Sequence, residues 1–127
     1  MDLLWWLPFG QVPEINSEEL HAQLQEAPPP LVIDVRTHKE FAQGHIVGAV
    51  NVPITELKSR LDSLELQEDH PVVAVCRSAH RSIPAVRLFR RVGIRNACQL
   101  EGGMLAWEKA DMPTVNPDRG EESTAGN

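Results

Sequence analysis

One stretch of the chain joins a short apolar run to a polar loop and the start of a helical pattern: Pro71-Val72-Val73-Ala74-Val75-Cys76-Arg77-Ser78-Ala79-His80-Arg81-Ser82. The apolar run predicts a buried strand over Val72 to Val75. After the loop, apolar residues recur at helical spacing, and the pattern predicts a helix whose inward face carries Val86, Phe89 and Val92. Pro84 is compatible with this helix because it falls in the first turn. The stretch therefore predicts a strand, a cysteine loop and a helix in immediate succession.

This arrangement favours a reactive thiol at Cys76. Loop N–H groups and a helix N-terminus together form a pocket of partial positive charge. Arg77, His80 and Arg81 add cationic groups within the same few residues. A cysteine at the rim of such a pocket is stabilised as the thiolate, which is the nucleophilic form. We therefore predict that Cys76 is a nucleophile.

The charge of the chain is unevenly distributed. The net charge is −6, yet residues 76–95 hold six arginines and no acidic residue, whereas residues 1–75 hold twelve acidic and four basic residues. A basic window in an acidic protein fits a site that attracts a small anion, and the overall charge argues against nucleic-acid binding. We assign anion attraction to Arg77 and Arg81. The other four arginines are interpreted as the solvent-exposed face of a helix: Arg87, Arg90, Arg91 and Arg95.

The length of 127 residues predicts one domain. Two cysteines cannot form a disulfide framework, and the chain has no Cys-x-x-Cys motif or Cys/His cluster, so we expect neither a metal site nor a cofactor. Reduced thiols point to a cytoplasmic protein. Cys98 lies in a short apolar run and is interpreted as a buried small hydrophobic residue.

Strands and helices alternate along the chain. Asn16 and Glu19 form a capping-box signature for a helix that runs to about Glu26. Further helices, or a turn in the first case, are predicted over 37–42, 55–66, 82–92 and after Gly103, and strands over 31–35, 49–52, 72–75 and 97–100. The alternation predicts a three-layer α/β/α domain with a mainly parallel sheet. Ligands of such sheets bind beyond the carboxyl ends of the strands, where Cys76 falls.

The two ends of the chain differ from this pattern. Residues 1–13 form an apolar segment with adjacent Trp5 and Trp6, too short to span a bilayer and unlike a signal peptide. We expect it to pack on its own domain; the alternative is that residues 1–9 dock on a partner protein or a membrane surface. Residues 116–127 are polar and aperiodic and are predicted to be a disordered tail, which leaves 14–115 as the domain.

A series of short motifs follows one order along the chain: Leu31-Val32-Ile33-Asp34-Val35-Arg36, Glu40-Phe41, Gly44-His45-Ile46, Gly48-Ala49, Asn51-Val52-Pro53, the Cys76 loop, and Leu100-Glu101-Gly102-Gly103 with Trp107. Each motif is weak alone. Their order and spacing around a strand, cysteine loop and helix resemble the rhodanese (thiosulfate sulfurtransferase) family in its single-domain form. The resemblance covers about Glu14 to Pro113 and implies a rhodanese-like fold.

The resemblance also implies an activity. The Cys76 thiolate would take the outer sulfur of a small anionic donor such as thiosulfate and carry it as a persulfide. Cyanide, a cellular thiol or a thioredoxin-like protein would accept that sulfur. Arg77 and Arg81 would attract the donor and stabilise the leaving sulfite, and His80 would tune the thiolate or assist proton transfer. The residues implied in substrate binding are the whole loop: Arg77, Ser78, Ala79, His80, Arg81 and Ser82.

Residues outside the loop receive structural interpretations. Asp34 and Arg36 are expected to form an ion-pair cluster with Glu40, a structural feature that also supports the site. His45 is interpreted as a packing and hydrogen-bonding residue, and Trp107 as part of the core.

One departure and two alternatives bear on the activity. Family loops commonly have glycine where this chain has Ala79, and alanine at positive φ costs on the order of 1–2 kcal/mol. Related phosphatases and arsenate reductases have Cys-x5-Arg loops, whereas Arg81 is the fifth residue after Cys76, and this Cys-x4-Arg spacing favours sulfur transfer. The other alternative is a non-catalytic rhodanese-like binding module recruited through residues 1–9, against which the intact Cys76 loop argues.

Overall fold

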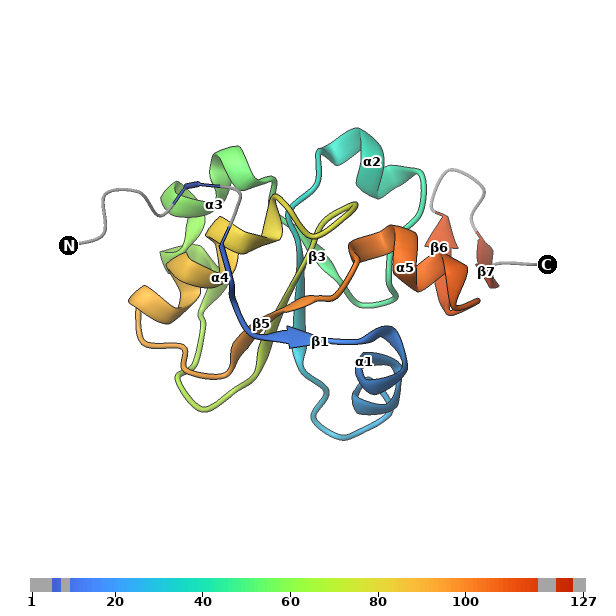
Figure 1. Ribbon diagram of the computed structural model, residues 1–127, viewed down its shortest axis with the longest axis horizontal. Coiled ribbons are helices and arrows are strands. Elements are labelled where there is room, and N and C mark those ends of the chain that lie inside the picture. The colour runs from blue at the N-terminus through green and yellow to red at the C-terminus, as the bar shows by residue number, and fades with distance from the viewer. Residues whose placement is uncertain (1–5, 8–9, 117–120, 125–127) are drawn as a thin grey trace.

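The computed structural model describes residues 6–7, 10–116 and 121–124. Its central sheet has five parallel strands in the order β1-β5-β4-β2-β3 (Figure 1). The strands are β1 (Glu14–Ile15), β2 (Leu31–Asp34), β3 (Val50–Asn51), β4 (Val72–Val75) and β5 (Ala97–Leu100). The helices are α1 (Ser17–Gln23), α2 (His38–Ala42), α3 (Ile54–Arg60), α4 (Ser82–Arg91) and α5 (Gly103–Lys109). This confirms the predicted α/β class and the parallel sheet.

Two helices begin at capping boxes that their sequences encode. Asn16 Oδ1 accepts from the N–H of Glu19 at 2.8 Å, and Glu19 Oε1 accepts from the N–H of Asn16 at 3.1 Å. Thr37 and Glu40 form the same reciprocal pair at the start of α2. Each box satisfies backbone donors that the first helical turn leaves unpaired. The predicted N-terminus of α1 is therefore confirmed, and α2 uses the same device.

Strand β4 is the centre of the sheet. It pairs with β2 on one side and β5 on the other, so neither edge is open. All four of its residues are buried, as a continuous Val-Val-Ala-Val run requires in a parallel strand covered on both faces. Cys76 follows directly after its carboxyl end.

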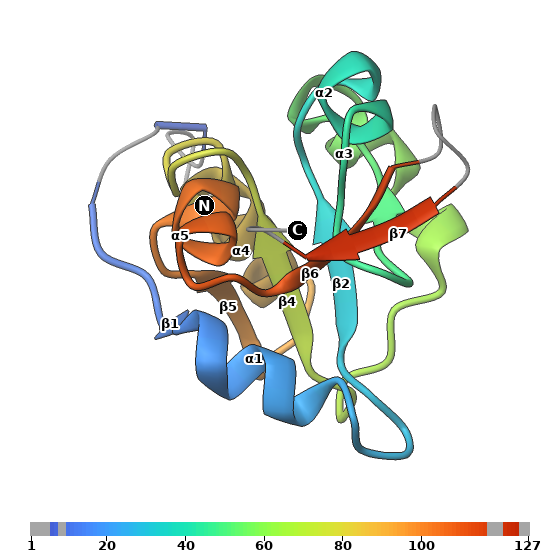
Figure 2. The ribbon, with the colours of Figure 1, turned by 90° about the vertical axis from the view of Figure 1, so that its right-hand side faces the viewer.

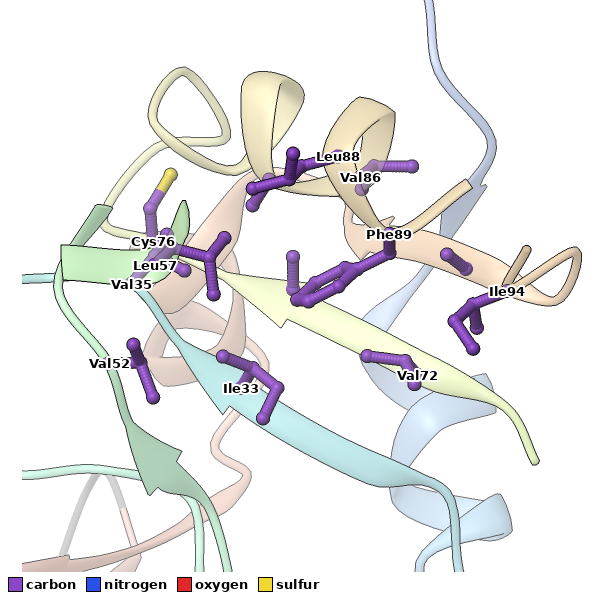
Figure 3. Close-up of a cluster of buried hydrophobic side chains, with 13 residues drawn as sticks. Ile33, Val35, Val52, Leu57, Val72, Cys76, Val86, Leu88, Phe89 and Ile94 are labelled. Carbon is purple, nitrogen blue, oxygen red and sulfur yellow. The ribbon is translucent and has the colours of Figure 1, made fainter. Parts of the chain in front are cut away.

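Helices cover both faces of the sheet (Figures 1 and 2). On one face, side chains of α3 and α4 such as Leu57 and Phe89 pack on β2 and β4; Cys76 belongs to this cluster and lies at one end of it (Figure 3). On the other face, Leu20, Met104 and Trp107 of α1 and α5 pack on the alternate residues of the same strands. Trp107 is fully buried, as predicted.

The structure corrects two predicted helix details. The helix over 55–66 is two elements, α3 and a 3₁₀ turn at Asp62–Leu64, which ends where Glu65 takes a left-handed conformation. Val92 does not face inward: 49% of its surface is exposed. Helix α4 ends at Arg91, and the chain reverses at Gly93, whose φ is 101°. Val92 therefore lies beyond the last regular turn.

The ends of the chain are described only in part. Residues 1–5 and 8–9 lie outside the described residues, so the docking alternative for residues 1–9 stays a prediction. Arg87 Nη1 donates to the carbonyl of Leu7 at 2.7 Å. Glu121–Thr124 pairs as β7 with β6 (Pro113–Asn116) in an antiparallel ribbon, while residues 117–120 and 125–127 lie outside the described residues, so the disordered tail over 116–127 stays a prediction. Backbone pairing forms this ribbon, and residues 116–127 carry no apolar period that would predict it.

Candidate active site

Cys76 is held at the base of the loop between β4 and α4. Only 1% of its surface is exposed, and its Sγ lies 3.4 Å from the hydroxyl of Ser82, the first residue of α4. The short strand and the first turn of the helix therefore fix the sulfur from two sides. This is the strand, cysteine loop and helix that the sequence predicts.

The first turn of α5 locks the backbone around Cys76. The N–H of Met104 donates to the carbonyl of Cys76 at 2.8 Å, and the N–H of Leu105 donates to the carbonyl of Arg77 at 3.0 Å. This approach requires Gly103, because a Cβ there would overlap those two carbonyl groups. Gly103 also has a φ of 61°, which glycine adopts without a steric penalty.

The loop itself projects toward solvent. Arg77, Ser78 and His80 are exposed, and Ser78 Oγ lies 3.0 Å from His80 Nδ1. Ala79 has a φ of 71°, so the strained conformation foreseen for an alanine at this point is present. The turn is closed by the N–H of Ile83, which donates to the carbonyl of His80 at 3.3 Å.

Arg81 is bound by Glu40 of α2. Its two terminal nitrogens donate to the two carboxylate oxygens at 2.6 and 2.9 Å. The hydrogen bond from Arg81 lowers the pKa of Glu40 from 4.5 to about 2, against the opposing effect of partial burial. The same hydrogen bond raises the pKa of Arg81, and the charges of Cys76 and Asp34 lie close enough to add to that rise. Arg81 is therefore close enough to Cys76 for an electrostatic interaction, but it is already paired with Glu40.

The expected cluster of Asp34, Arg36 and Glu40 is two separate pairs. Arg36 Nη2 donates to Asp34 Oδ2 at 2.7 Å and to the carbonyl of Gly44 at 2.8 Å, and both members of the pair are buried. Glu40 pairs with Arg81 instead. Asn51 braces the strand end by donating to the carbonyls of Asp34 and Arg36 at 3.0 Å.

Arg77 is the cation that faces the open side of the loop. It is exposed, and its guanidinium makes no hydrogen bond or ion pair within the part of the chain that the structure describes. A cleft of about 400 Å³ beside the loop is lined by Arg36, Glu40, Arg77 and Leu105. Within the described residues, the Arg77 guanidinium at the rim of the cleft therefore has no bonded partner, while Arg36, which follows β2, and Glu40 of α2 are paired.

Most of the chain is similar to a known protein family. Residues 16–110 match the rhodanese-like domain family. The chain belongs to the rhodanese family. This places it among the rhodanese-like sulfurtransferases, and it confirms the family resemblance.

Individual relatives differ in how much of their length the chain spans. It is 36% identical over 107 residues to a sulfurtransferase of Allochromatium vinosum, a match that covers 84% of this chain and 98% of that protein. It is 44% identical over 91 residues to an HTH-type transcriptional regulator of Mycobacterium tuberculosis, covering 70% of this chain and 39% of the regulator. A solved structure of a rhodanese-related protein from Thermoplasma volcanium matches with a TM-score of 0.74 and 28% identity, covering 83% of this chain and 99% of that one.

Other sequence-based expectations for this rhodanese domain can be placed. His45 is buried, stacks on Phe41 with ring centroids 3.6 Å apart and bonds the Phe41 carbonyl through Nδ1, as a packing residue should. Cys98 is half-buried, and burial raises the pKa of its thiol to about 11. In the described chain, no group of three His, Cys, Asp or Glu side chains could hold a metal ion. None of the described helices is long and apolar enough to cross a membrane.

Sequence reasoning missed Gln99 of β5. Its side chain is buried beside Ser82, and Ser82 Oγ donates to Gln99 Oε1 at 2.6 Å. The signal was present, since Gln99 is a polar residue inside the short apolar run that predicts β5. A buried amide needs partners, which points to a polar network.

Proposed function

We propose that this rhodanese domain transfers sulfane sulfur from a donor to a thiophilic acceptor through a persulfide on Cys76. The observation that carries the proposal is the position of Cys76. It sits at the carboxyl end of β4, under a loop with Cys-x4-Arg spacing, with its carbonyl bound by the first turn of α5. The similarity to a sulfurtransferase that the match covers over 98% of its length supports the same chemistry.

The proposed reaction has two displacements. The Cys76 thiolate attacks the outer sulfur of thiosulfate, forming a new S–S bond while the S–S bond of thiosulfate breaks and sulfite leaves with the electron pair. An acceptor thiolate or cyanide then attacks the outer sulfur of the persulfide. That S–S bond breaks and Cys76 leaves as the thiolate, so the enzyme is restored without an external oxidant or reductant.

The charged residues support an anionic donor. The Arg77 guanidinium is exposed at the cleft and unpaired among the described residues, so it is the group proposed to meet the donor first and to stabilise sulfite as it leaves. Arg81 contributes less than the sequence suggested because Glu40 already neutralises it. Its proposed role is to hold the loop against α2 rather than to bind thiosulfate directly.

Mass spectrometry of the intact protein tests the proposal. Incubation with thiosulfate should add the mass of one sulfur atom, and cyanide should remove it. The Cys76→Ser variant should remain unmodified, because the second cysteine of the sequence, Cys98, lies in β5 and not in the loop. Cys98→Ser is the matched control and should load sulfur like the wild-type protein, since burial raises the pKa of Cys98 to about 11 and leaves it unreactive near neutral pH.

Two results would reject the assignment. Sulfur loading of Cys76→Ser would show that another group is the nucleophile. No loading of the wild-type protein by thiosulfate, by an organic persulfide or by any other sulfane-sulfur donor would favour a non-catalytic binding module.

A further inference from the structure

A chain of hydrogen bonds leads from Cys76 to the edge of the sheet. Cys76 Sγ lies 3.4 Å from Ser82 Oγ, Ser82 Oγ donates to Gln99 Oε1 at 2.6 Å, and Gln99 Nε2 donates to Glu14 Oε2 at 2.8 Å. The register of β1 against β5 places Glu14 opposite Gln99. Ser82 and Gln99 are buried, with 0% and 4% of their surfaces exposed, whereas Glu14 is exposed. The chain therefore connects the buried sulfur to a surface carboxylate.

The hydrogen-bonding groups of Glu14, Gln99 and Ser82 set which atom donates in each of these hydrogen bonds. An ionised carboxylate can only accept, so Glu14 requires the NH₂ group of Gln99 to face it. The carbonyl oxygen of Gln99 must then face Ser82, and it too can only accept. Ser82 has one hydroxyl hydrogen, which this arrangement commits to Gln99. Toward Cys76, Ser82 can therefore offer only a lone pair.

This direction matters because the charge of the sulfur changes during the proposed reaction. A protonated thiol can donate to Ser82, and the whole chain is then satisfied. A thiolate has no hydrogen to donate and needs a donor instead. To serve it, Ser82 must turn its hydrogen away from Gln99, which leaves the buried carbonyl of Gln99 unpaired.

We propose that Gln99 is a positioning residue, oriented by Glu14, that holds the Ser82 hydroxyl away from Cys76 and thereby favours the thiol over the thiolate in the resting protein. The proposal deepens the proposed role of Cys76 as the nucleophile. Ser82 links the two residues, because its hydroxyl contacts both the sulfur of Cys76 and the side chain of Gln99. Glu14 acts at the far end, through Gln99.

The loop and the elements near it carry other charged groups. They lie on β1, β2 and the residues after it, α2, the loop, the turn after β5 and α5: Glu14, Asp34, Arg36, Glu40, Arg77, His80, Arg81, Glu101 and Glu108. His80 lies on the exposed side of the loop. All of these groups except Glu14 are unchanged in the variants below, so they contribute equally to each profile.

The test is the pH dependence of Cys76 ionisation in the full chain, measured from the ultraviolet absorbance of the thiolate. Subtracting the absorbance profile of the Cys76→Ser variant removes the contribution of Cys98 and leaves that of Cys76. Gln99→Met keeps the volume of the side chain but releases the Ser82 hydrogen, so we expect the ionisation midpoint to fall by about one pH unit. This variant does not change the charge of the protein, so a field effect cannot mimic the shift.

A double-mutant cycle tests whether Gln99 acts on Cys76 through the Ser82 hydroxyl. Gln99→Met in a Ser82→Ala background should produce no shift, because the hydroxyl that it releases is absent. Glu14→Gln should lower the midpoint by a smaller amount, since Gln99 is then free to turn. Glu18→Gln removes the same charge from the exposed first turn of α1 and should leave the midpoint unchanged.

Three results would overturn the proposal. They are an unchanged midpoint in a folded Gln99→Met protein, a Gln99→Met shift that persists without Ser82, and equal effects of Glu14→Gln and Glu18→Gln. If Gln99→Met does not fold, the comparison of Glu14→Gln with Glu18→Gln decides whether the proposal stands. No sulfur donor is present in the titration of Cys76. A titration that contradicts the role of Gln99 is therefore distinct from a persulfide assay that contradicts the proposed function.

Discussion

At the scale of single residues, the arginine beside the sulfur is already occupied. Arg81 makes two hydrogen bonds to Glu40, a residue 41 positions earlier in the chain. A bidentate pair of this kind removes the charge that an incoming anion would otherwise meet. Glu40 therefore limits how strongly the site attracts an anionic donor.

Glu40→Gln tests this limit. Glutamine at the third helical position still completes the capping box with Thr37, so the variant weakens the ion pair without removing the cap of α2. We expect the KM for thiosulfate to fall severalfold, because a freed Arg81 adds a cation beside Cys76. Steady-state kinetics with thiosulfate and cyanide measure this. The gain should vanish in the Glu40→Gln/Arg81→Gln double variant, and Glu18→Gln should have no effect; an unchanged KM in Glu40→Gln would contradict the idea.

The backbone conformation of Ala79 carries an energetic cost. Its φ of 71° is unfavourable for any residue with a Cβ. Ala79→Gly should relieve about 1–2 kcal/mol of strain and lose about 0.5–1 kcal/mol through the added freedom of the unfolded chain. We expect a net gain of about 0.5–1 kcal/mol in the free energy of unfolding by chemical denaturation. Ala79→Val should be destabilising, and a stable valine variant would contradict the strain.

At the scale of elements, the loop depends on α5 as much as on α4. Two N–H groups from the first turn of α5 hold the carbonyls of Cys76 and Arg77. The loop is therefore held between two helices: α4, which follows it directly, and α5, which follows β5. This explains why the first residue of α5 is a glycine, Gly103.

Gly103→Ala tests the clamp. An added Cβ would overlap the backbone of Cys76 and Arg77, and it would also be strained at a φ of 61°. We expect a loss of about 2–4 kcal/mol in the free energy of unfolding, together with slower sulfur loading of Cys76. Gly48→Ala is the control, since Gly48 has a φ of 83° but nothing within 4 Å of an added Cβ. It should cost only about 1–2 kcal/mol and leave loading unchanged; equal effects of the two variants would exclude the clamp.

At the scale of the whole molecule, the pair of Glu40 and Arg81 joins α2 to the active-site loop. The folded protein lowers the pKa of Glu40 to about 2, below the usual 4.5. A carboxyl with a lowered pKa binds protons more weakly in the folded state than in the unfolded state. Its stabilisation is therefore fully present above about pH 4.5 and is lost as the pH falls toward 2.

This linkage predicts how stability changes with pH. At pH 7 the wild-type protein should be more stable than Glu40→Gln by about 1 kcal/mol, a value that allows for solvent screening of a partly exposed pair. The difference should shrink steadily below pH 4.5. Denaturant unfolding at a series of pH values measures it. A difference that stays constant between pH 7 and pH 3 would mean that the ion pair is not its source.

Much of this protein was predictable from local sequence. The bounds of β4 and β5 follow from short apolar runs between polar or proline residues, and the start of α1 follows from a capping box. The loop spacing and the order of the motifs indicated the family. These signals are local, because an apolar run or a cap depends on residues within a few positions of one another.

Tertiary structure alone decided the remaining features. The two-residue strand β1 is too short to carry a periodic signal and exists because β5 offers it an edge. The pairing of Arg81 with Glu40 and the hydrogen bonds from Cys76 through Ser82 and Gln99 to Glu14 join residues 6 to 85 positions apart. Sequence determined that a cysteine would follow a buried strand. The fold decided which charges and hydroxyls that cysteine meets, because such contacts depend on strand order and helix packing.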